Sequence, residues 1–298
     1  MKDFISFVRG IQQKYSLIDL KSVRSIYKPR DPFSNKATYG HVLLLAGSYG
    51  KIGAAVMAAK ACLRGGAGLL TAHLPSCGYS IMQTAVPEAM VLVDPRSHEI
   101  STIPEDLEPY RVIAAGPGIG TGKSAREMVK KLLENYQHPL VLDADALNIL
   151  SMEKELLLKI PPNSILTPHP KEFDRLFGPA ETNVHRFELA RQNAAKYQVI
   201  LILKGHYTGI FCPGETLFFN TNGNAGMAKG GSGDVLTGIV AAMLAQSYTP
   251  SEAARMAVFL HGLAGDIAAE FYSEEAMLPT DLIGCLGKAF VKLKETQE

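Results

Sequence analysis

A glycine-rich stretch organises the whole chain: residues 220–240 read NTNGNAGMAKGGSGDVLTGIV. Five glycines fall between Gly223 and Gly233, and an apolar run that can form a helix begins at Val235. Glycine tolerates positive φ angles and lets a ligand approach the backbone closely. The free N–H groups and the positive end of the helix dipole at such a helix start form an anion site. We therefore expect residues 220–240 to bind a phosphate group.

Asp234 lies at the mouth of this expected anion site, where a carboxylate would repel phosphate. One interpretation is structural, because an Asp at the start of a helix interacts favourably with the helix dipole. The other is catalytic: Asp234 takes a proton from a substrate hydroxyl beside a transferring phosphoryl group. The chain contains no Gly-x-x-x-x-Gly-Lys-Ser/Thr motif, so the expected phosphate site is of another kind.

The composition describes a globular protein and gives no sign of a nucleic-acid or membrane partner. Of the 298 residues 47% are hydrophobic, and 30 basic residues balance 29 acidic ones to a net charge of +1. The N-terminus is too short and too charged for a signal peptide, and no run of about 18 apolar residues could span a membrane. The four cysteines form no Cys-x-x-Cys pair, which fits reduced thiols in a cytoplasmic protein.

Strand-like and helix-like segments alternate through most of the chain. Residues 42–46 form a continuous apolar run, as expected for a buried parallel strand, and a glycine turn at 47–53 leads into a helix over 54–63. The same order of strand, glycine turn and helix recurs over residues 112–135. This alternation predicts an α/β domain with a mainly parallel sheet that helices cover on both faces.

The remaining predicted elements lie toward the two ends of the chain. Residues 1–30 predict one or two short amphipathic helices, because apolar residues from Leu17 to Ile26 recur at roughly helical spacing, and residues 28–40 form a polar connector. Toward the C-terminus we predict a hairpin and three apolar helices, over residues 209–219, 233–246, 250–271 and 280–294.

Polar or glycine-rich clusters follow five of the predicted strands. They occupy residues 47–53, 116–120, 143–148, 167–172 and 204–208. Ligands of open α/β sheets bind beyond the carboxyl ends of the strands. We infer that one cleft gathers all five clusters.

Several of these clusters carry groups suited to phosphate or metal binding. Glu172 could hold Mg²⁺ directly or through water, and His169 could hydrogen-bond a substrate. Lys204 could neutralise phosphate oxygens. The structural alternatives stay open: a first-turn charge for Glu172, a surface position for His169 and an ordinary turn after Lys204. Asp143 and Asp145 follow another strand, where one can cap the next helix while the other faces the cleft.

Motifs spread from Tyr39 to Lys292 together resemble one family, the ADP/ATP-dependent NAD(P)H-hydrate dehydratases of the ribokinase-like superfamily. The motifs are YGHV (39–42), AGS (46–48), GGAGL (65–69), GPGIG (116–120), DADALN (143–148), TPHP (167–170), KG (204–205), and NAGM followed by GSGDVLTG (224–238). Each motif alone is unspecific, but the combination is highly specific.

The resemblance implies a three-layer ribokinase-like fold without a lid domain. It also implies metabolite repair, in which ADP or ATP with Mg²⁺ is used to convert the S-form of hydrated NADH or NADPH back to the normal cofactor. The hydroxyl of the hydrate is phosphorylated, and phosphate then leaves. Bacterial members of the family generally use ADP, so we expect ADP as the donor and AMP as the product.

The resemblance assigns roles to individual residues. At the hydrated dinucleotide it places Ala54, Gly118, Gly120, His169 and Asp234, with Asp234 as the base that activates the hydroxyl. At the adenine nucleotide it places Lys204, Gly205, His206, Tyr207, Thr208, Gly231, Ser232 and Gly233. The N–H groups of residues 231–233 would stabilise charge on the transferring phosphoryl group. Glu172 lies where relatives with an Asn-x-x-Glu motif organise Mg²⁺, and here His169 replaces the Asn.

The chain departs from the family pattern at three positions. Lys171 stands where Gly is frequent, Lys229 where Thr is common, and Ser232 where Thr or Met is common. The two lysines either strengthen anion binding or lie in solvent, and they bear on nucleotide preference more than on the reaction.

Many relatives also carry an N-terminal epimerase domain that interconverts the two hydrate forms. We expect residues 1–38 to be a helical segment or remnant linker, and residues 39–298 to be the dehydratase domain. The epimerase would then be a separate partner protein, and we expect the chain to form a homo-oligomer.

Two other functions compete with this interpretation. A small-molecule kinase of the same fold, acting on a vitamin precursor or a sugar, would share Gly233 and Asp234 but release a stable phosphorylated product. A nucleotide-binding regulatory protein would have lost catalysis, and the intact Asp234 argues against it. A long groove lined by residues 47–54 and 116–120 would favour a dinucleotide substrate over a small one.

Overall fold

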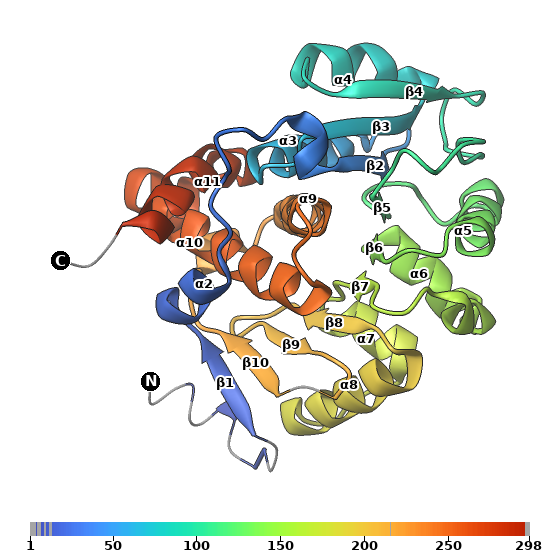
Figure 1. Cartoon of the computed structure of the whole chain (residues 1–298). Helices are drawn as coiled ribbons and strands as arrows, with labels where there is room; N and C mark the ends of the chain where they lie inside the picture. Colours follow the sequence, from blue (N-terminus) through green and yellow to red (C-terminus); the bar gives the residue numbers. More distant parts are fainter. Residues whose placement is uncertain (1–3, 5–6, 9, 12–13, 215, 296–298) are drawn as a thin grey trace.

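The computed structural model describes residues 4, 7–8, 10–11, 14–214 and 216–295, and its centre is a single ten-stranded sheet (Figure 1). The strands are β1 (Tyr15–Ile18), β2 (His41–Leu45), β3 (Leu69–Pro75), β4 (Met90–Asp94), β5 (Val112–Ala115), β6 (Leu140–Leu142), β7 (Ile165–Leu166), β8 (Ile200–Leu203), β9 (Gly209–Phe211) and β10 (Leu217–Asn220). Their order across the sheet is β1-β10-β9-β8-β7-β6-β5-β2-β3-β4. Only β9 runs against its two neighbours, and all other paired strands are parallel. The predicted mainly parallel sheet is confirmed.

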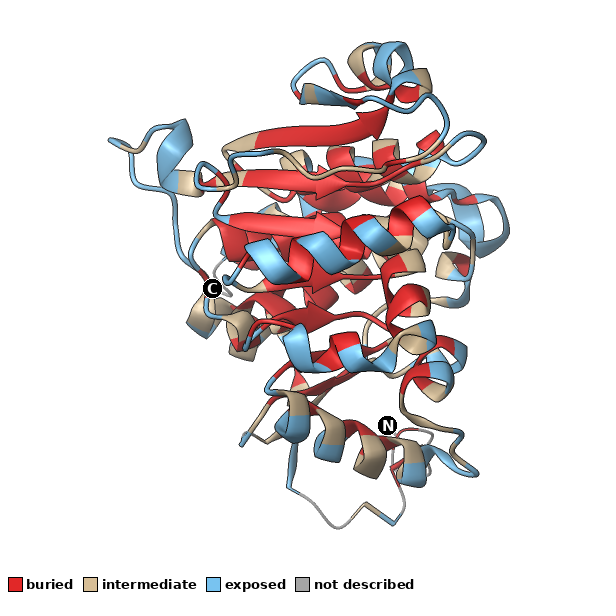
Figure 2. Ribbon diagram, turned by 90° about the vertical axis from the view of Figure 1, so that its right-hand side faces the viewer, coloured by how far each residue is buried: buried red, intermediate tan, exposed pale blue. Residues whose placement is uncertain are grey.

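Helices cover both faces of the sheet. They are α2 (Leu20–Ile26), α3 (Ile52–Arg64), α4 (Tyr79–Ala85), α5 (Lys123–Asn135), α6 (Asp145–Met152), α7 (Pro170–Phe177), α8 (Asn183–Tyr197), α9 (Ser232–Ala245), α10 (Pro250–Ala276) and α11 (Pro279–Lys294). One core holds the inner faces of α2, α3, α4, α9, α10 and α11, and a second core, on the opposite face, holds those of α5 to α8. Figure 2 shows the buried strands between these partly exposed helices. The predicted three-layer fold is confirmed, and the described residues form no second sheet that could act as a lid.

Helices α3 and α9 pack unusually closely on one face of the sheet. A Cβ atom on Gly238 would lie 2.2 Å from the carbonyl oxygen of Ala58. Only glycine therefore permits this approach of the two backbones. The contact sets the position of α9, whose first turn begins at Ser232.

The N-terminal region differs from its prediction. Residues 15–18 form β1, a strand that pairs in parallel with β10 at one edge of the sheet, and only residues 20–26 form a helix. The apolar residues Leu17 and Ile18 serve this strand, because Ile18 lies in one core and Leu17 packs against the other, on the opposite face of the sheet. The prediction of a helix is thus wrong for residues 15–18. Most of residues 1–13 lie outside the described residues. The boundary after residue 38 stays a prediction.

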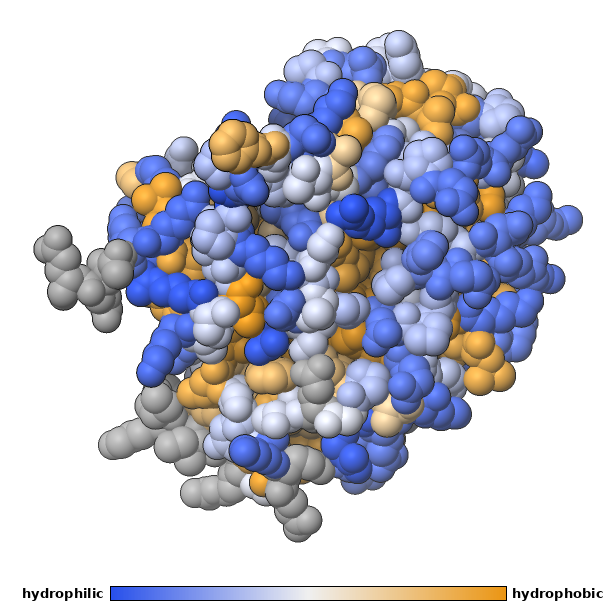
Figure 3. Space-filling model, viewed as in Figure 1, coloured by the Kyte–Doolittle hydropathy of each residue, from blue (hydrophilic) through white to orange (hydrophobic). Residues whose placement is uncertain are grey.

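The opposite edge of the sheet exposes apolar side chains. Met90, Leu92 and Val93 of β4 are each more than a third exposed, and Figure 3 shows an apolar group at the top of the viewed face, over β4. Within the described residues, no helix combines the length and apolar character needed to cross a lipid bilayer.

Candidate functional site

The site lies where the order of strands reverses. The chain passes from β2 outward to β3 and β4, then returns to β5 on the other side of β2. The connections that leave β2 and β5 therefore lead to helices on opposite faces of the sheet, α3 and α5, and ligands of such sheets bind at this point beyond the strand ends. The two loops contact each other: Gly47 N–H donates to the carbonyl of Pro117 across 2.7 Å, and Ser48 Oγ donates to that of Gly118 across 2.7 Å.

The turn after β5 also contacts the next strand end. A Cβ atom on Gly116 would lie 1.8 Å from the carbonyl oxygen of Asp143, and Gly116 has φ = 133°. Gly118 follows at φ = 68°, and a Cβ atom there would lie 3.3 Å from that of Ala54. The structure thus brings together Ala54 and Gly118, which the sequence assigned to one ligand.

The glycine-rich loop ends at the start of α9, as predicted. Gly231 is the N-cap residue at φ = 104°, and Asp234 is the third residue of the helix. No side chain caps this start. Ser232 N–H makes a long turn hydrogen bond to the carbonyl of Lys229, across 3.3 Å, and the N–H groups of Gly233 and Asp234 remain available to a ligand. The loop is anchored by α10, because Asp266 accepts from Gly223 N–H and Asn224 Nδ2, each across 3.0 Å.

Asp143 and Lys204 form an ion pair beneath this helix start. Nζ of Lys204 lies 2.8 Å from Oδ1 of Asp143, and Thr237 of α9 donates to Oδ2 of Asp143 across 2.7 Å. Asp143 is only 1% exposed. Burial disfavours the ammonium, but the charges of Asp143, Glu172 and Asp234 outweigh burial and raise the pKa of Lys204. Lys204 therefore remains a fixed cation beside the glycine loop, where a Cβ on Gly233 would lie 3.3 Å from its Nζ.

Asp234 has the properties of a general base. Burial raises its pKa to about 6, and the negative charges of Asp143 and Asp145 add to this rise while Lys204 opposes it. Within the described residues the structure shows no hydrogen bond to its carboxylate. An ionised carboxylate with a pKa near neutrality and free acceptor oxygens is suited to take a proton from a hydroxyl group. Asp234 also lies in the first turn of α9, as its structural interpretation, a favourable interaction with the helix dipole, required.

His169 and Glu172 form a capping box at the start of α7. Nδ1 of His169 accepts from the N–H groups of Lys171 and Glu172, and Glu172 Oε2 accepts from His169 N–H across 2.9 Å. Burial, followed by the charge of Lys204, lowers the pKa of His169. His169 is therefore neutral at pH 7, and Nε2 carries the proton because Nδ1 is an acceptor. Nε2 lies 3.4 Å from Glu172 Oε1, and the 43% exposure of the side chain leaves this N–H group accessible to a ligand as well.

Glu172 also faces the ion pair, since its Oε2 lies 3.9 Å from Nζ of Lys204. Burial raises its pKa, and Lys204 opposes that rise. Among the described residues no three His, Cys, Asp or Glu side chains are grouped as a metal site. A single buried carboxylate fits a Mg²⁺ ion held mainly by nucleotide phosphates and water, not one held by a protein cage.

Asp145 links the ion-pair region to the turn after β5. Its Oδ2 accepts from Gly120 N–H across 2.8 Å and lies 3.3 Å from Nζ of Lys51. The prediction that Asp143 or Asp145 caps α6 is wrong, because Ala144 occupies the N-cap position at φ = 49° without a side-chain cap. Both carboxylates instead face the site.

The segment after β8 is only partly directed toward the site. Lys204 lies at its centre, whereas the ring of Tyr207 packs against Phe4 and Phe7 at centroid distances of 5.1 Å. Thr208 Oγ1 donates to the carbonyl of Gly205, which closes a tight turn. Residues 205–208 therefore form an ordinary turn, and Lys204 can at the same time act as a cation of the site.

Two observations went beyond the sequence. His261 of α10 donates from Nε2 to the carbonyl of Ser232 across 3.0 Å, and burial lowers its pKa to about 4, so it is neutral. A lone His within an apolar helix gives no sequence signal for this contact.

Lys229 neither contacts the anion site nor lies free in solvent, because its Nζ binds the carbonyls of Glu275 and Met277 at the end of α10.

Comparisons with known proteins identify the family of this chain. A model of the NAD(P)H-hydrate dehydratase family matches residues 42–287. The ADP-dependent (S)-NAD(P)H-hydrate dehydratase of Bacillus subtilis is 35% identical over 274 residues, covering 91% of this chain and 96% of that protein. The bifunctional NAD(P)H-hydrate repair enzyme Nnr of Moorella thermoacetica is 38% identical over 284 residues, or 92% of this chain. The chain spans about half the length of such bifunctional relatives, 54% in this case.

Solved structures show the same relationship. The structure of the ADP/ATP-dependent NAD(P)H-hydrate dehydratase of B. subtilis, co-crystallised with ATP/Mg²⁺, superposes with a TM-score of 0.83 at 31% identity, covering 96% of this chain and all of that one. A ribokinase-like superfamily protein of Enterococcus faecalis gives 0.82 at 30% identity, covering 94% and 96%. By its sequence and by its fold, the chain belongs to the NAD(P)H-hydrate dehydratase family.

Proposed function

We propose that the protein dehydrates the S-form of NAD(P)H hydrate to NAD(P)H with ADP or ATP as the phosphoryl donor. The observation that carries the proposal is the placement of Asp234. Its carboxylate, with a pKa raised to about 6, lies in the first turn of α9, and Lys204 is near enough to affect that pKa. A base, a cation and free helix N–H groups at one point are the parts that phosphoryl transfer to a hydroxyl requires.

The proposed reaction has two steps. Asp234 takes the proton of the hydrate hydroxyl while that oxygen attacks the terminal phosphorus of the nucleotide, so that AMP leaves ADP, or ADP leaves ATP. The C–O bond of the phosphorylated hydrate then breaks, phosphate departs with the electron pair, and a proton leaves the adjacent carbon. The carbon–carbon double bond of the reduced nicotinamide is thereby restored.

The remaining site residues serve the two ligands. Lys204 and the N–H groups of residues 231–233 would bind the phosphate oxygens on which charge develops. The other nucleotide contacts would come from residues 205–208, where the backbone rather than the Tyr207 ring faces the ligand. His169 would donate its Nε2 proton to the hydrated dinucleotide, which passes Ala54 and the turn from Gly118 to Gly120.

ADP with Mg²⁺ is the donor that we propose for this chain. The B. subtilis relative is named ADP-dependent, and the structure of that relative was obtained with ATP/Mg²⁺. Glu172 would hold the ion through water, because its carboxylate already accepts from His169 N–H. The ion would neutralise the nucleotide phosphates.

Family membership favours this function over a small-molecule kinase. The matched relatives are named as dehydratases or hydrate repair enzymes. Residues 47–48 and 117–118 lie in contact, and these two loops would together line the longer groove that a dinucleotide needs.

The cellular setting forms part of the proposal. The protein would act in the cytoplasm and depend on an NAD(P)H-hydrate epimerase to supply the S-form. It would assemble as a homo-oligomer, for which the exposed apolar edge strand β4 is a candidate contact surface. Light scattering of the purified protein measures the assembly directly.

The reaction itself is tested with purified hydrates. The protein is incubated with NADH hydrate or NADPH hydrate, Mg²⁺ and either ADP or ATP, and the absorbance of reduced nicotinamide is followed. Recovery of absorbance only with nucleotide, together with release of phosphate, is the expected result. A lack of recovery with both donors, while nucleotide still binds, would contradict the dehydratase and favour the kinase.

A further inference from the structure

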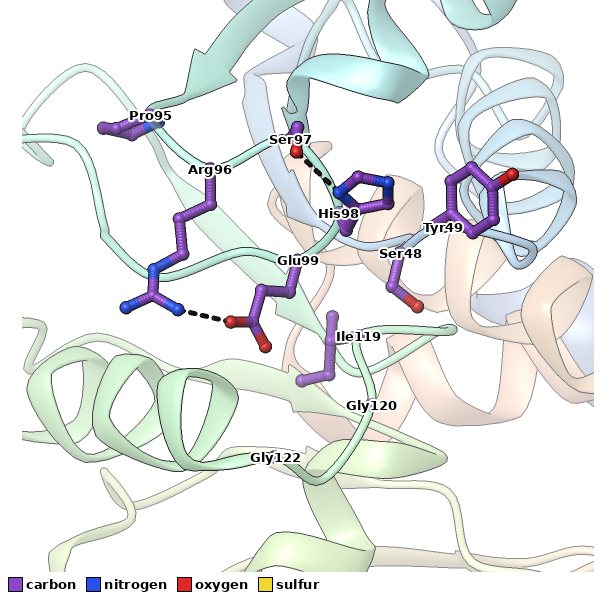
Figure 4. Close-up of a pocket in the computed structure, with 10 residues that line it drawn as sticks. All are labelled: Ser48, Tyr49, Pro95, Arg96, Ser97, His98, Glu99, Ile119, Gly120 and Gly122. Carbon is purple, nitrogen blue, oxygen red and sulfur yellow. Dashed lines mark hydrogen bonds and ion pairs between the residues drawn. The ribbon is translucent and has the colours of Figure 1, made fainter.

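A cavity of about 640 Å³ opens beside the Asp234 region, and no step of the proposed reaction uses it. Its walls come from the loops that follow β2, β4 and β5 (Figure 4). The loops after β2 and β5 lie at the reversal of strand order, so the cavity is at the place where α/β sheets bind ligands.

The cavity borders the residues of the reaction site at Gly120. Gly120 lines the cavity, and its N–H group donates to Asp145 Oδ2 across 2.8 Å. Asp145 in turn is near enough to Asp234 to influence its ionisation. A ligand that reaches Asp234 with one end and passes the turn from Gly118 to Gly120 would place its other end in this cavity.

One end of the cavity carries opposite charges with unused hydrogen-bonding capacity. Arg96 Nη1 lies 2.6 Å from Glu99 Oε1, and Ser124 Oγ donates to the same oxygen across 2.9 Å. Within the described part of the chain, Nε and Nη2 of Arg96 and Oε2 of Glu99 make no hydrogen bond. A ligand therefore meets free guanidinium donors and a free carboxylate acceptor side by side.

The other end of the cavity carries two aromatic rings. The rings of Tyr49 and His98 have centroids 4.7 Å apart, and Tyr49 N–H donates to the carbonyl of His98 across 2.8 Å. Tyr49 is 69% exposed, so its ring is open to a flat ligand group. Figure 4 shows the Arg96–Glu99 pair toward the left of the view and the two rings toward the right.

The loop that bears these groups is held in place from below. The carboxylate of Asp94, 1% exposed, accepts from the N–H groups of Arg96, Ser101 and Thr102. The hydroxyl groups of Ser101 and Thr102 donate to it as well. The cavity wall is therefore pre-organised, which lowers the entropic cost of binding.

We propose that this cavity binds the adenosine end of the hydrated dinucleotide and that Arg96 and Glu99 set the choice between its NADPH and NADH forms. In dinucleotide sites a carboxylate accepts from the ribose 2′-hydroxyl of NAD, and an arginine accommodates the 2′-phosphate of NADP. The cavity holds both groups, so the protein accepts both forms. Adenine stacks on the Tyr49 ring.

This inference rests on the proposed function, and binding of the unreactive cofactors tests it separately. The dissociation constants of NADP⁺ and NAD⁺ are measured by calorimetry with AMP at saturation, together with KM for the two hydrates. Arg96→Ala should raise the dissociation constant of NADP⁺ and the KM for NADPH hydrate about tenfold or more. This is the scale of a charge-assisted hydrogen bond to phosphate. Binding of NAD⁺ should change less than about twofold, because no 2′-phosphate is present.

Two further variants sharpen the test. Glu99→Gln should weaken the binding of NAD⁺ and leave the binding of NADP⁺ unchanged or stronger, which is the opposite of the effect of Arg96→Ala. Lys123→Ala is the matched control, because Lys123 follows the cavity residue Gly122 but pairs with Glu127 on an exposed helix face. Lys123→Ala should change the affinity for neither cofactor.

Other outcomes overturn the inference. They are an equal effect of Arg96→Ala on both cofactors, no effect of Arg96→Ala, the same loss from Lys123→Ala, or no binding of NADP⁺ to the unmodified protein. Failure of the protein to convert either hydrate, with cofactor preference still shifted by Arg96→Ala, would instead contradict the proposed function and leave the cavity assignment supported.

Discussion

The ammonium of Lys204 lies 2.8 Å from the carboxylate of Asp143, although the two residues are 61 positions apart in the chain. Each follows a parallel strand of the central sheet, β8 and β6, so the pair joins two strand ends beneath the start of α9. Because Thr237 donates to the second oxygen of Asp143, the pair also fixes α9 itself. The stability of the fold and the anion binding that we propose therefore depend on the same contact.

Asp143→Ala should lower the free energy of unfolding by about 3–5 kcal/mol, because it removes the closest partner of a largely buried Lys204 and leaves only the more distant Glu172, at 3.9 Å. Glu134→Ala is the matched control. Glu134 and Lys159 are separated by a similar 2.7 Å, but both are more than 40% exposed. Urea denaturation of both variants measures the difference, and equal effects would show that burial does not determine the strength of the Lys204 pair.

Asp234→Asn should reduce kcat by about 10²-fold or more, the usual scale of a positioned base, because an amide cannot accept the hydroxyl proton. Nucleotide affinity should be kept or improved, since a negative charge near the phosphates is removed. In the unmodified protein, kcat/KM should fall tenfold per pH unit below about pH 6, where Asp234 becomes protonated. A full rate in Asp234→Asn would exclude Asp234 as the base.

The same variant should be more stable than the unmodified protein at neutral pH. The pKa of Asp234 is about 6 in the folded state and near 3.8 in the unfolded chain, so the folded state binds the proton more tightly. The resulting stabilisation is complete below pH 3.8 and is lost as the pH rises through 6. Asp234→Asn should therefore add about 1–3 kcal/mol at pH 7 and almost nothing at pH 3.5. Thermal unfolding at the two pH values measures this, and equal effects at both would contradict the raised pKa.

His261→Ala should lower both stability and activity, because it removes the donor to the carbonyl of Ser232 in the first turn of α9. We expect a loss of about 1–3 kcal/mol in unfolding free energy, from the lost hydrogen bond and from the cavity that the ring leaves. We also expect about a tenfold loss in kcat/KM for ADP, as the N–H groups of residues 231–233 lose their alignment. His185→Ala, on the exposed face of α8, should change neither quantity. Normal activity of His261→Ala would restrict His261 to a packing role.

The sequence predicted the parts of the site that local patterns determine. Parallel strands and the glycine turns at 47–53 and 116–120 follow from apolar runs and from glycine itself, and the carboxyl ends of parallel strands meet at one edge. The first-turn position of Asp234 follows equally from the loop-to-helix pattern.

Long-range contacts could not be predicted, because local sequence patterns do not determine which distant segments meet. β1 has four residues and pairs with β10 about 200 positions later, so its spacing matched a helix equally well. The contacts of His261 and Lys229 depend on where α10 lies against the glycine loop. The cavity next to Tyr49 depends on the loop after β4, which reads as an ordinary connector in the sequence.

Gly238→Ala tests the close approach of α3 and α9. A methyl group there would lie 2.2 Å from the backbone oxygen of Ala58, so α9 must shift away from α3. We expect a loss of about 1–3 kcal/mol in stability, the usual cost of overpacking, and a reduced kcat because Asp234 moves with the helix. Gly284→Ala is the matched control, a helical glycine of α11 with no atom within 4 Å of the added Cβ, where alanine should stabilise by about 0.5–1 kcal/mol. Comparable stability of the two variants would mean that α9 is free to move without disturbing the fold.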